Sequence, residues 1–211
     1  MKTLRLLPRI GTTYCLLPML LGLILTACVT AQENSEDIEW LIDALELTEG
    51  SVVADVGAGD GDQTLAIAEH IGPNGQIYST ELGEESLQEL RENIEWAGVG
   101  NVTIVEGLPD QANLPAECCQ AIYMRRVYHH IGNPSSFNVS LLESLKPGGR
   151  LAIIDFEPSN EEAEPGGRAS GGQHGVTTET VINEITSAGF TLVSSENASG
   201  RNFYLLFQKP E

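Results

Sequence analysis

The stretch Ala54–Thr64, ADVGAGDGDQT, combines glycines with carboxylates directly after the apolar residues Val52 and Val53. Glycines at this spacing let the backbone approach a ligand closely, and the N–H groups of such a loop can bind an anionic group. Asp60 and Asp62 disfavour a pyrophosphate, because that ligand needs positive potential around it. We therefore expect a ligand that offers an anionic group to the loop and also carries positive charge.

Two cofactor classes compete for this loop. Dinucleotide binding requires G-x-G-x-x-G, and the third glycine position counted from Gly57 is Asp62, so a nicotinamide oxidoreductase is a poor interpretation. S-adenosylmethionine carries a sulfonium, an ammonium and a single carboxylate. Backbone N–H groups would meet its carboxylate, and the nearby acids would suit its cationic parts.

The elements that must position the loop alternate along the chain. We expect helices over 35–50, 62–72, 84–98, 134–146 and 177–190, and strands over 51–56, 75–81, 101–107, 119–127, 150–158, 191–197 and 202–209. Alternation of this kind predicts a parallel sheet with helices on both faces. The turn between the last two strands is short, which forces antiparallel pairing. The expected fold class is α/β, a Rossmann-like, doubly wound, mostly parallel seven-stranded sheet with an antiparallel C-terminal hairpin.

The glycine loop also matches a specific sequence motif. Its sequence D-V-G-A-G-D-G, which begins at Asp55, resembles the D-x-G-x-G-x-G motif of class I S-adenosylmethionine-dependent methyltransferases of the small-molecule type. The resemblance implies that Asp55 and the loop residues Gly57, Ala58 and Gly59 hold the methionine part of S-adenosylmethionine. It also implies methyl transfer to a small molecule.

Two further positions extend the resemblance. One carboxylate at the end of the second strand, about 20 residues past the glycine loop, suits the two hydroxyls of a ribose, and Glu81 stands there. After the third strand the family often has Gly-Asp-x-x-x-Leu-Pro. Asp110 takes the place of that acid, with two residues inserted after Gly107. By resemblance, Asp110 accepts a hydrogen bond from the adenine amino group, and Leu82 and Gln111 are neighbours of the adenine.

The end of the fourth strand faces the reactive methyl group in this family's fold. Methyl transfer needs alignment of the nucleophile and exclusion of water, and a base only if the nucleophile keeps its proton. His129 and His130 are adjacent, so they point different ways, and either could act as base or substrate contact. The alternative is that one stacks under the adenine. Tyr128 is a candidate substrate contact, with core packing as its alternative.

His174 closes a Gly-, Glu- and Ser-rich stretch over residues 158–175. A loop of this length predicts a lid or mobile segment, and loops after the fifth strand commonly cover the substrate in this fold. We therefore name His174 with the other two histidines as a catalytic candidate. A histidine on a surface loop is the alternative.

The same strand end departs from the family, which often has an acid or asparagine where Arg125 and Arg126 stand. Arg126 in an acidic protein suggests an anionic substrate group such as a carboxylate or phenolate. Pairing with a surface acid such as Glu157 is the alternative. No Asn-Pro-Pro-Tyr motif or acidic metal triad is present, and we expect no metal.

The first thirty residues have the layout of a secretory signal, with Lys2, Arg5 and Arg9 before an apolar run. The ending LTAC resembles a bacterial lipobox, which implies lipidation of Cys28. We therefore expect a signal peptide over 1–27, a tether over 28–34 and a methyltransferase domain over 35–211. No aspartate follows the cysteine, which by resemblance favours the periplasmic side of the outer membrane. A membrane tether that faces the cytoplasm is the alternative.

The net charge of −19, from 11 basic and 30 acidic residues, excludes nucleic acid as an expected partner. The oligomeric state stays open. Cys118 and Cys119 are expected to stay unpaired, because adjacent cysteines rarely pair. Export conflicts with the cytoplasmic origin of S-adenosylmethionine. An alternative function is therefore an exported lipoprotein that keeps a catalytically inactive methyltransferase fold to bind a small ligand.

Overall fold

The computed structural model describes residues 34–159, 168–169, 174–198 and 200–211. Within it, one compact unit runs from Asp37 to Glu211. The expected signal peptide, the lipidation site Cys28 and most of the loop over 158–175 lie outside the described residues. In the described ranges, no helix has the length and apolarity needed to cross a membrane.

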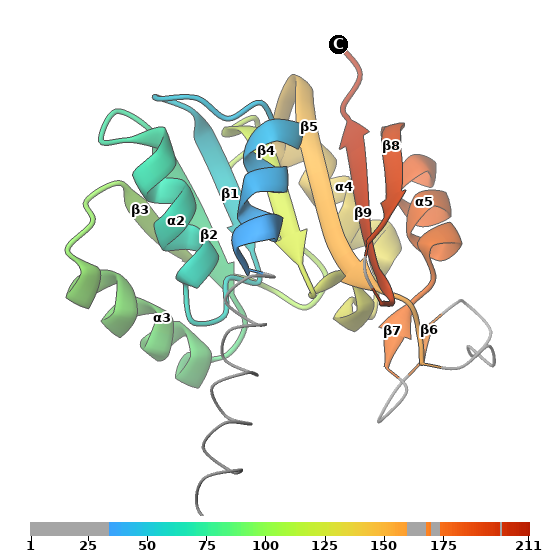
Figure 1. The fold of residues 1–211 in the computed structure, drawn as a ribbon, viewed down its shortest axis with the longest axis horizontal. Helices are drawn as coiled ribbons and strands as arrows, with labels where there is room; N and C mark the ends of the chain where they lie inside the picture. Colours follow the sequence, from blue (N-terminus) through green and yellow to red (C-terminus); the bar gives the residue numbers. More distant parts are fainter. Residues whose placement is uncertain (1–33, 160–167, 170–173, 199) are drawn as a thin grey trace, which may run out of the picture. The chain divides into compact units, whose positions relative to one another are not determined.

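Seven strands form one sheet in the order β3-β2-β1-β4-β5-β9-β8 (Figure 1). Their bounds are β1 Val52–Val56, β2 Gln76–Glu81, β3 Val102–Glu106, β4 Cys119–Arg125, β5 Leu145–Phe156, β8 Thr191–Asn197 and β9 Asn202–Gln208. Strands β1 to β5 pair in parallel, whereas β9 is antiparallel to both β5 and β8. The expected fold class, with its antiparallel C-terminal hairpin, is confirmed.

Helices cover both faces of the sheet because the buried strands alternate apolar side chains between two cores. The numbered helices are α2 Asp62–Ile71, α3 Glu84–Ala97, α4 Pro134–Ser144 and α5 Thr178–Ser187, and a further helix spans residues 34–44. On β5, Ile153 packs in the core that α4 and α5 cover, while Ile154 packs in the core that α2 and the first helix cover. Figure 1 shows α2 and the blue first helix in front of the sheet and α4 behind it.

The first helix is fixed at the carboxyl end of β4. The Nε atom of Arg125 donates to the carboxylate of Asp37, which is 3% exposed. The hydroxyl of Tyr204 donates to the same carboxylate at 2.6 Å, and Trp40 stacks on the Tyr204 ring. Arg125 therefore has a structural contact in the position where the family often carries an acid or asparagine.

Strand β5 begins at Leu145, five residues before the expected start at 150. The helix expected over 134–146 ends at Ser144, and the segment Lys146–Gly149 pairs with the last residues of the chain. The N–H of Lys209 donates to the carbonyl of Gly149 at 2.8 Å, and the N–H of Gly148 donates to the carbonyl of Lys209 at 3.1 Å. Tertiary pairing thus overrides the local Pro-Gly pattern.

Two short elements lie where loop was expected. Strands β6 (Arg168–Ala169) and β7 (Gly175–Val176) pair antiparallel within the segment expected as a loop.

Strand β4 ends at Arg125, two residues before the expected end at 127, and a 3₁₀ turn, η1 (Tyr128–His130), follows it. The turn directs the side chains of adjacent residues differently from a continued strand.

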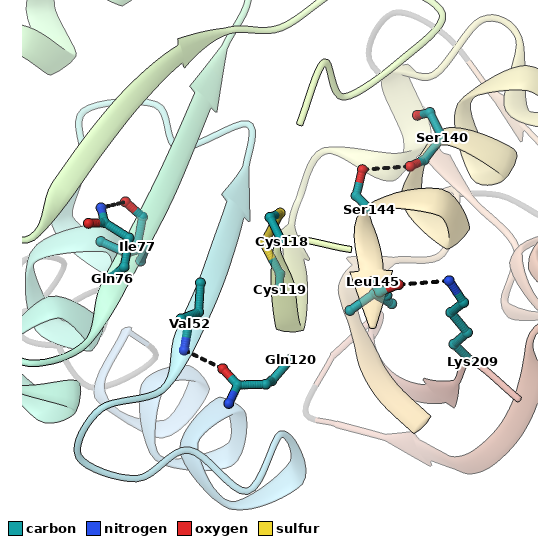
Figure 2. The surroundings of a disulfide bond; sticks show 10 residues. All are labelled: Val52, Gln76, Ile77, Cys118, Cys119, Gln120, Ser140, Ser144, Leu145 and Lys209. Carbon is teal, nitrogen blue, oxygen red and sulfur yellow. Dashed lines mark hydrogen bonds between the residues drawn. A yellow bond between two sulfur atoms is a disulfide. The ribbon is translucent and has the colours of Figure 1, made fainter. Parts of the chain in front are cut away.

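Cys118 and Cys119 are joined by a disulfide, so the expectation of two unpaired cysteines was wrong (Figure 2). The pairing of β4 with β5 shifts register between Cys119 and Ala121, so the Cys118–Cys119 segment does not continue the regular strand pairing. The side chain of Gln120 compensates, because its Oε1 accepts a hydrogen bond from the N–H of Val52 at 2.6 Å. Such an irregularity leaves no trace in the pattern of apolar residues.

Candidate active site

A cavity of about 630 Å³ lies at the carboxyl ends of the parallel strands. Its walls come from the segments that follow β1, β2, β3 and β4, on both sides of the point where the strand order reverses. Open α/β sheets bind ligands at this position. The described lining residues are Val56, Gly57, Thr80, Glu81, Leu82, Gly107, Leu108, Pro109, Gln111, Ala112, Val127, His130, Ile131, Gly132 and Phe137.

The glycine loop that follows β1 approaches its neighbours closely. Gly57 has φ +81°, and a Cβ there would lie 2.8 Å from Cγ1 of Val127. The N–H groups of Gly57 and Ala58 both donate to the carbonyl of Thr80 at 2.9 Å. Only glycine combines this φ with this lack of space, so the loop is a backbone surface at the edge of the cavity.

Glu81 connects the end of β2 to the glycine loop. Its Oε2 accepts a hydrogen bond from the N–H of Gly59 at 2.6 Å, and its Oε1 accepts one from the N–H of Leu82 at 2.7 Å. The carboxylate is thus oriented on both sides at the wall of the cavity. A carboxylate held in this way can accept two hydroxyl hydrogens from one ligand.

Asp55 lies beneath the loop and not among the lining residues that the structure describes. It is 2% exposed, and its Oδ2 accepts a hydrogen bond from the hydroxyl of Thr64 at 2.7 Å. Thr64 in turn contacts the hydroxyl of Ser79 at 2.8 Å. The Asp55 carboxylate therefore ties the loop to α2 and β2. Burial raises its pKa to about 6.

The raised pKa predicts a specific pH dependence for Asp55→Asn. The folded-state pKa of about 6 lies above the ordinary 3.8, so the wild type loses stability as pH rises through this window. The asparagine cannot ionise and is spared this loss. Its free energy of unfolding relative to the wild type should rise by about 3 kcal/mol between pH 3 and pH 7. Urea unfolding of both proteins at several pH values measures this, and a constant difference would contradict the account.

The segment after β3 forms another wall of the cavity. Leu108 and Gln111 are bridged, with the N–H of Leu108 donating to the carbonyl of Gln111 at 3.0 Å. Gln111 and the 54% exposed Leu82 both line the cavity, where an apolar rim suits a flat ring. Asp110 is exposed and lies outside the described lining, and its carbonyl accepts a hydrogen bond from Ser136.

The three histidines singled out from the sequence come together. The ring centroid of His129 lies 3.9 Å from that of His130 and 5.4 Å from that of His174. His130 is exposed and lines the cavity, whereas His129 is buried. The pKa of His130 is lowered, first by burial and then by the neighbouring His129. A neutral imidazole therefore faces the cavity near neutral pH.

Asp155, on β5, is a site residue that sequence reasoning missed. It is 1% exposed, and its Oδ1 lies 2.8 Å from Nδ1 of His129. The available signal was an acid within the apolar run LAIIDF, because a buried carboxylate needs a partner.

The two candidate substrate contacts lie differently. Tyr128 is fully buried, and its hydroxyl donates to Glu184 at 2.9 Å and accepts from Asn138 at 2.7 Å. It therefore joins η1 to α4 and α5 in the core. Arg126 is half-buried at the end of β4. Its backbone φ is +58°, a conformation that residues other than glycine rarely adopt. Such strain occurs preferentially at functional sites.

A family model described as a methyltransferase domain matches residues 47–202. The chain is 30% identical over 122 residues to a protein-L-isoaspartate O-methyltransferase of Ignicoccus hospitalis, covering 57% of this chain and 55% of the relative. It is 29% identical over 126 residues to a ubiquinone/menaquinone biosynthesis C-methyltransferase UbiE of Pseudomonas fluorescens, covering 57% and 49%. The match thus spans about half the length of these relatives.

Among solved structures, a SAM-dependent methyltransferase from Aquifex aeolicus superposes with a TM-score of 0.68 at 23% identity. The superposition covers 82% of this chain and 89% of that chain. At this identity the similarity establishes the fold alone.

Proposed function

The chain belongs to the methyltransferase family whose domain model it matches, with S-adenosylmethionine as its cofactor, and we propose that it methylates a small molecule by in-line transfer. The observation that carries the proposal is Glu81, a carboxylate oriented by two N–H groups at the wall of an apolar cavity. The described lining has Gly57, Gly107 and Glu81 but no lysine or arginine, which suits a positively charged nucleoside better than a pyrophosphate.

Different residues at the cavity would contact different parts of the cofactor. Glu81 would hold its ribose hydroxyls, and Leu82 and Gln111 would contact its adenine. The loop around Gly57 would let its methionine part approach the backbone closely, although the N–H groups of Gly57 and Ala58 donate to Thr80 and not to the cavity. Asp55 would act from beneath by fixing the loop. When bound, the cofactor supplies an electrophilic methyl group on a sulfonium with a neutral leaving group.

The substrate would approach from the β4 side of the cavity. His130, which lines the cavity, is the proposed contact with the reacting group, with His129 and His174 beside it. Arg126 at the end of β4 is proposed to attract an anionic group of the substrate. One named relative is an O-methyltransferase and the other a C-methyltransferase, so the relatives leave the methylated atom open.

A transfer assay tests this proposal. The full chain, purified in detergent, would be incubated with S-adenosylmethionine labelled in its methyl group and with a filtered small-molecule extract. We expect label in the low-mass fraction, and loss of transfer in His130→Ala with binding of S-adenosylhomocysteine retained. Bound cofactor whose label never moves to any small molecule would favour the alternative, a small-ligand binding module.

We further propose that the chain is exported and held by lipid on Cys28, on the periplasmic side of the outer membrane. The basic, apolar and small-residue order of residues 1–28 supports this. Only nine positions (37 minus 28) separate Cys28 from Asp37, or about 30 Å of extended chain. Labelled palmitate should enter the wild type and not Cys28→Ser, and an alkaline-phosphatase fusion after residue 40 should be active. An inactive fusion would contradict export and favour a tether that faces the cytoplasm.

A further inference from the structure

The carboxylate of Asp155 is saturated by donors from one neighbouring turn and its own strand. Its Oδ2 accepts the N–H of His129 at 3.0 Å, and its Oδ1 accepts the N–H of Phe156 at 2.9 Å and lies 2.8 Å from Nδ1 of His129. Both Asp155 and the His129 side chain are buried. Backbone and ring of His129 are therefore held by the same carboxylate, which fixes the ring orientation.

This contact also fixes where the ring carries its proton. Each oxygen of Asp155 accepts a backbone N–H, as suits a carboxylate that only accepts, and we infer that Nδ1 of His129 donates to it. In the neutral ring, Nε2 then keeps its lone pair on the side away from Asp155. Among the residues that the structure describes, buried Nε2 has no hydrogen-bond partner. Buried polar atoms of this kind are uncommon and call for an explanation.

The ring of His129 that carries Nε2 packs among three other aromatic rings. The His129 ring is flanked by His130, Phe156 and His174, with centroids at 3.9, 4.7 and 5.4 Å. Of these, His130 lines the cavity. Because the His129 ring packs against the His130 ring, the Asp155 contact that fixes His129 also limits where the His130 ring can lie. The negative charge of Asp155 raises the pKa of His130 and works against the lowering that burial and His129 cause.

We propose that Asp155 is a positioning residue that acts through His129 to make His130 the proton acceptor, and that the substrate is a phenol or enol whose hydroxyl keeps its proton at neutral pH. This rests on the proposed function. His130 is faced by His129, Asp155 and His174, and burial lowers its pKa. A weak base of this kind matches an acidic hydroxyl better than an aliphatic alcohol. A carboxylate substrate would need no base.

The proton and electron balance is simple. The O–H bond of the substrate breaks, its proton goes to an imidazole nitrogen of His130, and its electron pair stays on oxygen. A bond forms between that oxygen and the methyl carbon, and the electrons of the broken S–C bond stay on sulfur. The proton leaves His130 for water afterwards. No oxidant or metal is needed for this step.

Nitrogen NMR of the full chain labelled in its histidines tests the tautomer without turnover. In the wild type we expect His129 to carry its proton on Nδ1. In Asp155→Asn, the proton should move to Nε2 and the titration midpoint of His130 should fall by about one pH unit, because a negative charge is lost. Glu106→Gln, at an exposed acid on β3, should change neither. A wild-type proton on Nε2 would overturn the proposal, even if Asp155→Asn fails to fold.

Substrate class is tested with phenol, aniline and benzoate that carry the same ring substituents. We expect methylation of the phenol alone, with a pH profile that shifts in Asp155→Asn as the His130 midpoint does. Methylation of benzoate, with normal binding of S-adenosylhomocysteine, would overturn this inference and leave the proposed function intact. Absent binding of S-adenosylhomocysteine would instead overturn the proposed function.

Discussion

Glu81→Ala should raise the dissociation constant of S-adenosylhomocysteine about 100-fold. Two hydroxyl hydrogen bonds to a charged acceptor would be lost, and each contributes about 1.5 kcal/mol, so the sum corresponds to roughly two powers of ten. The N–H groups of Gly59 and Leu82 would also lose the acceptor that orders the loop. Isothermal titration of the wild type and the variant measures the effect.

Glu106→Ala is the matched control, because Glu106 pairs with Glu81 in register at the end of the neighbouring strand and is exposed. Its affinity for S-adenosylhomocysteine should stay within about twofold of the wild type, since a surface charge contributes little. Equal losses in both variants would point to overall negative charge as the cause. An unchanged affinity in Glu81→Ala would remove Glu81 from the site.

Gly57→Ala should lower the free energy of unfolding by about 2–5 kcal/mol and abolish cofactor binding. The left-handed φ costs an alanine about 1–2 kcal/mol, and the overlap of its Cβ with Val127 adds about 1–3 kcal/mol. Because the side chain of Val127 must move, the walls of the cavity would shift with it. Denaturant unfolding and titration with S-adenosylhomocysteine measure the two effects.

Two further variants separate strain from overlap. Gly59→Ala has a similar φ of +57° but no atom within 4 Å of the added Cβ, so it should lose only the strain. The double variant Gly57→Ala with Val127→Ala should recover part of the stability. If Gly57→Ala and Gly59→Ala are equally stable, overlap with Val127 plays no part in the choice of glycine.

The fold was predictable because strand and helix periods alternate clearly along the chain. The ends of parallel strands meet at one edge, so Glu81, Leu82 and Gln111 could be expected near one another without coordinates. The histidines were harder, since nothing in the spacing from His130 to His174 shows that β7 returns beside η1. Their proximity depends on tertiary packing.

The burial of the carboxylates of Asp55 and Asp155 was not predicted. Val53 belongs to the core that α2 covers, and Asp55 follows it by two positions, so strand alternation already directs its carboxylate toward α2. The family resemblance, applied alone, suggested a direct contact with the cofactor. Asp155 was missed because an acid near a strand end is usually solvated, and only burial shows that it needs His129.

Titration calorimetry with S-adenosylmethionine and S-adenosylhomocysteine into the full chain tests the central claim most directly. The account predicts one site per chain with micromolar affinity for both compounds, and no comparable heat with NADH. Absence of binding by a well-folded protein would contradict it, and would leave a chain that has kept the methyltransferase fold without its cofactor.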